Sequence, residues 1–129
     1  MAVVLVVEDD EQVRVMAESV LQQANHTVIA ATGADSAQAL LETDAAVDVL
    51  FIDLNLGSNV EAGLRVAIEA KAARPKLAVL YTTGAGINAG MKAMFVEPFL
   101  FLPKPYTVEQ LTKSVAFLLL GGRPRGKPL

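Results

Sequence analysis

The sequence predicts an α/β fold, a doubly wound five-stranded parallel sheet with five helices on its two faces. Three observations lead to this prediction. Five short apolar runs alternate with stretches of helical periodicity along the whole chain, a pattern typical of parallel sheets covered by helices. The length of 129 residues is that of one domain. Hydrophobic residues make up 53% of the chain and charged residues 19%, which is enough apolar material for a core on both faces.

The first part of the chain shows the strand and helix patterns twice. Val3–Val7 is an unbroken apolar run, typical of a strand that is buried on both faces. Apolar residues at helical spacing then predict a helix over residues 13–24. The β-branched and apolar run Thr27–Ala31 predicts a second strand. Thr32, with Asp35 three residues later, predicts a capping box that opens a second helix.

The middle of the chain repeats the alternation. Val47–Ile52 predicts a third strand, which ends on Asp53. Helical spacing over residues 60–74 predicts a third helix, which must end before Pro75 because the residue before a proline avoids helical geometry. Leu77–Thr82 then predicts the fourth strand.

The last part completes the pattern. We expect a short helix over Ile87–Phe95 and a fifth strand over Phe99–Leu102. Thr107 and Gln110 form a second predicted capping box, which opens a helix that runs to Leu120. Right-handed crossovers then favour the flavodoxin-like strand order 2-1-3-4-5, in which the carboxyl ends of strands one and three flank a ligand-binding crevice.

Composition excludes several kinds of site. The chain has no cysteine, which excludes disulfides and thiolate metal centres, and its single histidine, His26, is expected to be an ordinary exposed residue. A net charge of −3 and a pI near 5.1 argue against nucleic acid as a partner. No apolar run reaches the ~18 residues of a membrane span, so we expect no membrane association and a cytoplasmic location. We predict one domain over residues 1–120 and a flexible basic tail over residues 121–129.

Polar side chains follow four of the predicted strands. Glu8 and Asp9 follow the first strand, and Asp53 ends the third. Carboxylates gathered in one crevice repel each other and need a cation, and oxygen ligands without histidine or cysteine suit Mg²⁺. Thr83 follows the fourth strand and Lys104 the fifth. A carboxylate, a divalent cation, a hydroxyl and an ammonium at one point predict a phosphoryl-transfer site, with Asp53 as nucleophile.

Four stretches, each at the end of a predicted strand, resemble the response-regulator receiver domain, the phosphoacceptor module of two-component signalling. The resemblance covers about residues 2–120, and the chain is similar to single-domain response regulators. One such stretch alone would be weak evidence, but four in the family's order are specific. The matching stretches are Val6–Asp10, Leu50–Asn55, Leu80–Gly84 and Pro103–Tyr106.

The resemblance implies a signalling phosphoacceptor rather than an enzyme with its own substrate. By this resemblance, Asp53 accepts a phosphoryl group from a histidine kinase or a histidine phosphotransfer protein, as in a phosphorelay. Mg²⁺ is then held by Glu8, Asp9 and Asp53, together with the main-chain carbonyl of Asn55. Output passes through a protein–protein surface to a target that the sequence does not name.

The resemblance also implies a switch. Thr83 and Lys104 each bind a phosphoryl oxygen, and Phe101 occupies the position of the family's rotating aromatic residue. The Lys104–Pro105 bond is expected to be cis, an isomer that is energetically accessible only before proline. Phe101 has a second interpretation as a core aromatic residue, and Thr83 as an ordinary turn threonine.

The chain also departs from the family pattern. Gly57 stands where relatives usually have proline, and Ala62-Gly63 replaces the common Asp-Gly pair. These departures motivate an alternative function, a pseudo-receiver that binds its partner without phosphorylation. A dinucleotide-binding loop over Gly84–Gly90 is disfavoured because it follows the fourth strand instead of the first.

Two smaller sets of residues have alternative interpretations. Asp10 and Glu11 are expected to lie in a solvated turn, with Asp10 capping the first predicted helix. Four apolar residues near the fifth strand could form a homodimer face or belong to the core, and the core is preferred. They are Met91, Met94, Phe95 and Phe99.

Overall fold

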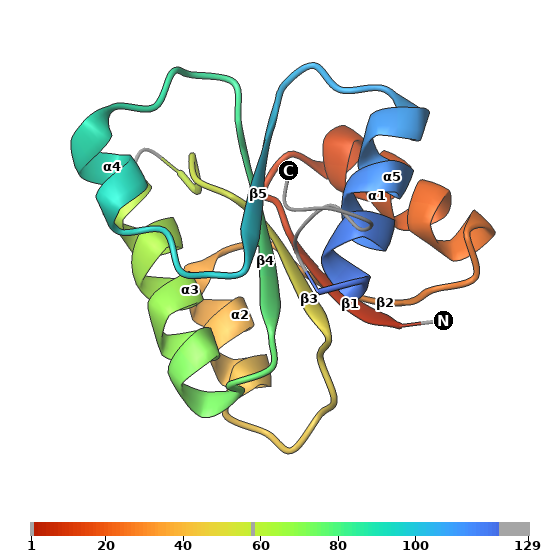
Figure 1. Ribbon diagram of the computed structural model, residues 1–129, viewed down its shortest axis with the longest axis horizontal. Coiled ribbons are helices and arrows are strands. Elements are labelled where there is room, and N and C mark those ends of the chain that lie inside the picture. Colours follow the sequence, from red (N-terminus) through yellow and green to blue (C-terminus); the bar gives the residue numbers. More distant parts are fainter. Residues whose placement is uncertain (1, 58, 122–129) are drawn as a thin grey trace.

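The computed structural model describes residues 2–57 and 59–121 and confirms the predicted sheet (Figure 1). Five parallel strands lie in the order β2-β1-β3-β4-β5. Each strand is followed by a helix, so every connection between neighbouring strands crosses a face of the sheet. The strands are β1 (Val3–Val7), β2 (Thr27–Ala31), β3 (Val49–Asp53), β4 (Ala78–Thr83) and β5 (Phe99–Pro103).

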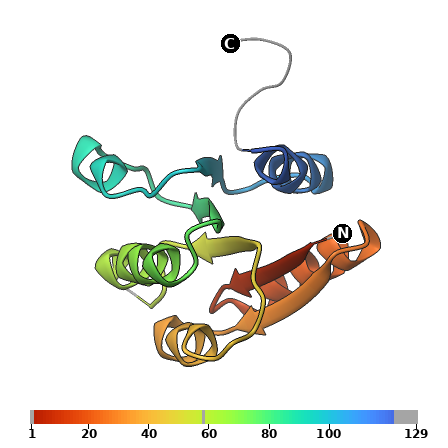
Figure 2. The same cartoon turned by 60° about the horizontal axis from the view of Figure 1, so that its bottom comes forward.

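The helices form two layers, with α1 and α5 on one face of the sheet and α2, α3 and α4 on the other (Figures 1 and 2). The central strands alternate between the layers: Leu50 and Ile52 pack in the core towards α2 and α3, whereas Val49 and Phe51 pack towards α1 and α5. Because both faces are covered, the strands have continuous apolar runs. The helices are α1 (Glu11–Gln23), α2 (Ala34–Leu41), α3 (Val60–Ala73), α4 (Ala89–Ala93) and α5 (Val108–Leu119).

Two of the predicted helix caps are confirmed. The Asp10 side chain accepts a hydrogen bond from the Val13 amide and caps α1. Thr107 and Gln110 form a capping box at the start of α5, in which each side chain accepts from the other residue's backbone amide. These caps satisfy amides that lack a partner within the helix.

The predicted capping box at Thr32 and Asp35 is wrong. The N-cap of α2 is Gly33, and the hydroxyl of Ser36 accepts hydrogen bonds from the amides of both Thr32 and Gly33. Ser36 thus accepts from the Thr32 amide, the donor that the predicted box assigned to Asp35, and the helix begins after Gly33.

Helix α4 is shorter than the prediction of Ile87–Phe95. The Asn88 side chain caps it by accepting from the Met91 amide. Beyond the helix, Phe95 turns into the core and stacks on Tyr81, with 3.9 Å between ring centroids. Asn88 thus begins the helix two residues later than expected, and the chain leaves helical geometry where Phe95 joins the core.

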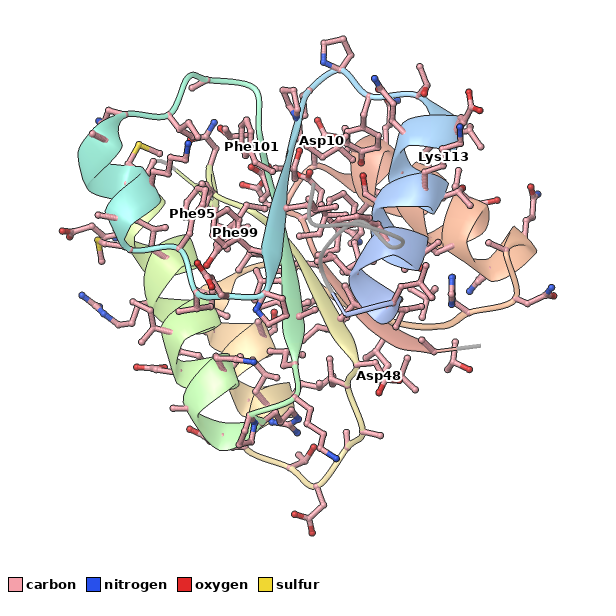
Figure 3. All side chains as sticks on the ribbon, viewed as in Figure 1. Asp10, Asp48, Phe95, Phe99, Phe101 and Lys113 are labelled. Atoms are coloured by element: carbon pink, nitrogen blue, oxygen red, sulfur yellow. The ribbon has the colours of Figure 1, made fainter. Side chains whose placement is uncertain are left out.

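The core interpretation of the apolar residues near β5 is confirmed for three of the four. Phe95 is buried, and Met91 and Phe99 are half-buried against the same cluster, whereas Met94 is 42% exposed. Figure 3 shows Phe95, Phe99 and Phe101 together on the α4 side of the sheet. The phenol of Tyr81 accepts a hydrogen bond from the amide between α4 and β5, at Val96, so this aromatic cluster holds the chain that leads into β5.

Two further expectations concern the basic tail and membrane association. The basic tail was predicted over residues 121–129, and residues 122–129 lie outside the described residues. Within the described ranges, no helix is both long and apolar enough to cross a membrane.

His26 is half-buried, not an ordinary exposed histidine as predicted. Its Nδ1 accepts a hydrogen bond from the Ala2 amide at 3.2 Å, and burial lowers the pKa of the imidazole below 6.5. The folded chain therefore favours neutral His26. Its contribution to stability is complete above pH 6.5 and is lost as the pH falls through the lowered pKa of the folded state.

We therefore expect the free energy of unfolding of the native chain to fall relative to that of His26→Gln as the pH drops below 6.5. Urea unfolding of both proteins across this pH range measures the difference. A difference that is independent of pH would contradict the proposed role of the neutral imidazole.

Gly63 lets α3 approach the carboxyl end of β3. A Cβ atom at this position would lie 3.2 Å from the Leu54 Cα and 3.3 Å from the Asp53 carbonyl oxygen. Backbone atoms cannot move aside as a flexible side chain can. The absence of a side chain at Gly63 thus sets the distance between the helix and the strand end that carries Asp53.

We expect Gly63→Val to lower the free energy of unfolding by about 1–3 kcal/mol, the usual cost of overpacking. Gly86→Val is the matched control, because a Cβ atom at Gly86 meets nothing within 4 Å. Urea unfolding of the two variants measures the effect. Equal stability of both would show that α3 can move away from β3 without cost.

Candidate functional site

The carboxyl ends of β1, β3, β4 and β5 meet at one edge of the sheet (Figure 1). In the register of the sheet, Asp53 pairs with Thr82, and Thr83 pairs with Pro103. Glu8 comes directly after β1, so it lies at the same edge. The parallel topology therefore brings together side chains that lie far apart in the sequence, as the strand order 2-1-3-4-5 predicts.

Lys104 links two of the predicted carboxylates. Its Nζ lies 2.8 Å from Glu8 Oε1 and 2.8 Å from Asp53 Oδ2. Glu8 is 4% exposed and Asp53 3%. Buried carboxylates need ionic or hydrogen-bonding partners, and Lys104 supplies both with one ammonium group.

Asp9 completes an acidic cluster, which we define as Glu8, Asp9 and Asp53. Carboxylate oxygens of the three residues lie within 4.8 Å of one another, and Asp9 is exposed while the other two are buried. With all groups ionised, three carboxylates against the one ammonium of Lys104 leave a charge of 3 − 1 = 2 negative units. These hard oxygen donors and their excess charge fit a divalent cation such as Mg²⁺.

The electrostatics of the cluster differ from residue to residue. Burial raises the pKa of Glu8 to about 7, although the hydrogen bond from Lys104 opposes this shift. Burial alone would lower the pKa of Lys104, but its hydrogen bonds to Asp53 and Glu8 raise it overall. Lys104 therefore stays cationic at neutral pH, and a nearby cation would favour the ionised form of Glu8.

Backbone contacts also fix the position of Glu8. Its Oε2 accepts a hydrogen bond from the Asp10 amide at 3.1 Å. Arg14 of α1 donates to the Glu8 carbonyl oxygen, also at 3.1 Å. This contact of Arg14 could not be predicted from the sequence, because it depends on how α1 packs beside the end of β1.

Asn55 contacts the site in a way that the sequence analysis missed. Its backbone amide donates to Asp53 Oδ1 at 2.9 Å, and its side-chain Nδ2 donates to Thr83 Oγ1 at 2.9 Å. Only the main-chain carbonyl of Asn55 is predicted from the sequence to belong to the site. A polar residue two positions after a strand-end acid was the available signal, but it does not reveal the direction of the side chain.

Gly57 makes a second contact that was not expected. Its amide donates to Asp9 Oδ2 at 2.9 Å, and its φ is +65°. Proline has no N–H and has its φ fixed near −65°, so the residue usual in relatives could not make this contact. The departure at Gly57 therefore allows the loop after β3 to bind Asp9.

The structure also places the other predicted residues. Phe101 is half-buried and packs beside Phe95 in the aromatic cluster, with 6.5 Å between ring centroids. The Lys104–Pro105 peptide bond is cis. Thr83 is 2% exposed and ends β4, one residue later than the predicted strand end. The switch roles of Phe101 and Thr83 remain predictions.

Comparisons with known proteins agree with this geometry. The family model of the response regulator receiver domain matches residues 4–116. The sensor kinase CckA of Brucella abortus is 28% identical over 120 residues, which are 92% of this chain and 12% of the kinase. The chain thus spans about an eighth of the length of this relative.

Solved structures show the same fold. A response regulator receiver protein from Sinorhizobium medicae superposes with a TM-score of 0.85 at 25% identity, covering 95% of this chain and 97% of that one. A CheY-like receiver domain from Methanospirillum hungatei gives a TM-score of 0.83 at 17% identity, with 95% and 96% covered, a likeness of fold alone. The family model matches most of this chain, and the acidic cluster lies at the expected strand ends. This chain therefore belongs to the response regulator receiver domain family.

Proposed function

We propose that Asp53 is a phosphoacceptor, which takes a phosphoryl group from the phosphohistidine of a histidine kinase or a histidine phosphotransfer protein. The observation that carries this proposal is the contact of Lys104 with Asp53 beside Glu8 and Asp9. A carboxylate oxygen of Asp53 attacks phosphorus as the P–N bond of the donor breaks. The phosphoryl group forms a new P–O bond, and the electron pair of the broken bond stays on the imidazole, which takes up a proton.

The residues present fit a bound Mg²⁺. Glu8, Asp9 and Asp53 would hold it, directly or through water, together with the carbonyl oxygen of Asn55. When bound, the ion neutralises charge on the phosphoryl oxygens. Lys104 and Thr83 would bind the remaining oxygens: the ammonium offsets their charge and the hydroxyl donates a hydrogen bond.

Phosphorylation would act as a switch through charge. It replaces the single negative charge of the Asp53 carboxylate with about two on the phosphoryl group. Lys104, which also contacts Glu8, would offset part of this added charge. Movement of Thr83 towards the new oxygens would open space beside Phe101, which would shift the population between two surfaces near α4 and β5. The output is then a change in a protein–protein contact. We place the domain in the cytoplasm with its phosphodonor.

One observation favours a second candidate, a pseudo-receiver that binds its partner without phosphorylation. The Gly57 amide donates a hydrogen bond to Asp9 Oδ2, so the backbone of the loop after β3 itself holds one carboxylate of the acidic cluster. A pseudo-receiver would bind a partner with equal affinity in its free and beryllofluoride-treated forms, whereas a phosphorylation switch would change this affinity.

The phosphoacceptor assignment can be tested by intact mass spectrometry. In acetyl phosphate and Mg²⁺, we expect the native chain to gain the mass of one phosphoryl group and Asp53→Asn to gain none, since the amide is not a nucleophile of this kind. Asp44→Asn is the matched control because Asp44 is exposed and lies outside the acidic cluster. Labelling that persists in Asp53→Asn would exclude Asp53 as the acceptor.

The metal site can be tested separately through stability. Because a ligand that binds only the folded state stabilises it, we expect Mg²⁺ to raise the melting temperature of the native chain. Asp9→Asn should reduce this increase, since it removes a charged ligand. Asp10→Asn should retain it, because asparagine preserves the α1 cap while it removes a neighbouring charge. An equal loss in both variants would indicate a general charge effect instead of a site at Asp9.

A further inference from the structure

The hydroxyl of Thr83 is buried with its acceptor capacity filled. Its Oγ1 accepts from Asn55 Nδ2 at 2.9 Å and from the Ala85 amide at 3.1 Å. A hydroxyl has two lone pairs and one proton, so these contacts use both lone pairs. In the described part of the chain, the structure records no acceptor for the Thr83 O–H. This proton is the one hydrogen-bonding group of the side chain that remains to be used.

Asn55 connects this hydroxyl to the acceptor residue. The same residue donates its backbone amide to Asp53 Oδ1 and its carboxamide to Thr83 Oγ1. One residue thus fixes the relative position of the carboxylate on β3 and the hydroxyl on β4. Phosphoryl oxygens accept hydrogen bonds and donate none at neutral pH, so a phosphoryl group on Asp53 requires a donor of this kind.

We propose that the Asn55 side chain is a positioning residue, which orients the Thr83 hydroxyl so that its free proton reaches a phosphoryl oxygen on Asp53. With Asn55 and Ala85 on the two lone pairs, the O–H bond keeps one remaining direction. The direction of the donor is therefore limited before the charge arrives, so that the movement of Thr83 towards the new oxygens needs less reorganisation of its hydroxyl. This inference rests on the proposed phosphoacceptor function and adds a role for a side chain that the function itself does not require.

The test uses beryllofluoride, an analogue of the phosphoryl group, titrated calorimetrically at saturating Mg²⁺. We expect Asn55→Ala to bind it about fivefold more weakly, the effect of one hydrogen bond. The same substitution should cause no further loss in a Thr83→Ala background, because Asn55 acts through Thr83. General destabilisation would weaken beryllofluoride binding in both backgrounds, so a loss of affinity confined to the chain that retains Thr83 would not be explained by it.

Two further variants complete the design. Asn59→Ala is the matched control. It removes a carboxamide of the same loop, one that caps α3 and does not contact Thr83. This variant should lower stability and leave beryllofluoride affinity unchanged. Asn55→Asp preserves the shape but replaces the donor by an acceptor that takes the Thr83 proton. It should weaken binding at least as much as Asn55→Ala, and it keeps the test available if the alanine variant does not fold.

The outcomes separate this inference from the proposed function. Unchanged affinity in Asn55→Ala would overturn the positioning role, as would an equal loss in the native and Thr83→Ala backgrounds. Affinity reduced by Asn59→Ala as strongly as by Asn55→Ala would also overturn it. If the native chain itself binds no beryllofluoride, the phosphoacceptor function fails, and the role of Asn55 fails with it.

Discussion

The double ion pair of Lys104 is the contact on which the rest of the site depends. Its ammonium joins Glu8 and Asp53, which are 96 and 51 positions away in the sequence, and both carboxylates are buried. Removing one partner of such a group leaves an uncompensated buried charge, which is strongly destabilising. The contact also leaves the acidic cluster with excess negative charge, so the arrangement that stabilises the site favours a divalent cation as well.

The sheet topology makes this contact possible. Since β1, β3, β4 and β5 are parallel neighbours, their carboxyl ends form one edge of the sheet, and the residues at or just after these ends lie at that edge. The helices set the remaining distances. Gly63 lets α3 lie close against the end of β3, and Asp10 begins α1 two residues after Glu8. The backbone geometry therefore sets the positions of the site residues, and their side chains need only small adjustments.

Much of this could be predicted from the sequence, because the determining signals are local. Unbroken apolar runs identified the strands, and the Thr107 and Gln110 side chains identified a helix start by a mechanism that acts within four residues. The same reasoning failed at Thr32, where the hydroxyl of Ser36 offered a competing acceptor. It also failed at Phe95, where packing against Tyr81 ended the short helix that periodicity extended.

The contacts of the loop after β3 could not be predicted, because they depend on tertiary structure. The Asn55 side chain reaches Thr83, and the Gly57 amide reaches Asp9, in each case across to another strand end. The resemblance implied only that the main-chain carbonyl of Asn55 is a Mg²⁺ ligand. It identified Gly57 only as a position that departs from the family pattern. The positive φ of Gly57 and the direction of the Asn55 carboxamide are properties of the folded loop.

The most direct test of the account is a crystal structure with Mg²⁺ and beryllofluoride bound. We expect one ion in contact with Glu8, Asp9 and Asp53, directly or through water, and the analogue on Asp53 within hydrogen-bonding distance of Lys104 and Thr83. An ion bound away from the acidic cluster, or an analogue on another carboxylate, would contradict the claim that the residues at the strand ends form the phosphoacceptor site.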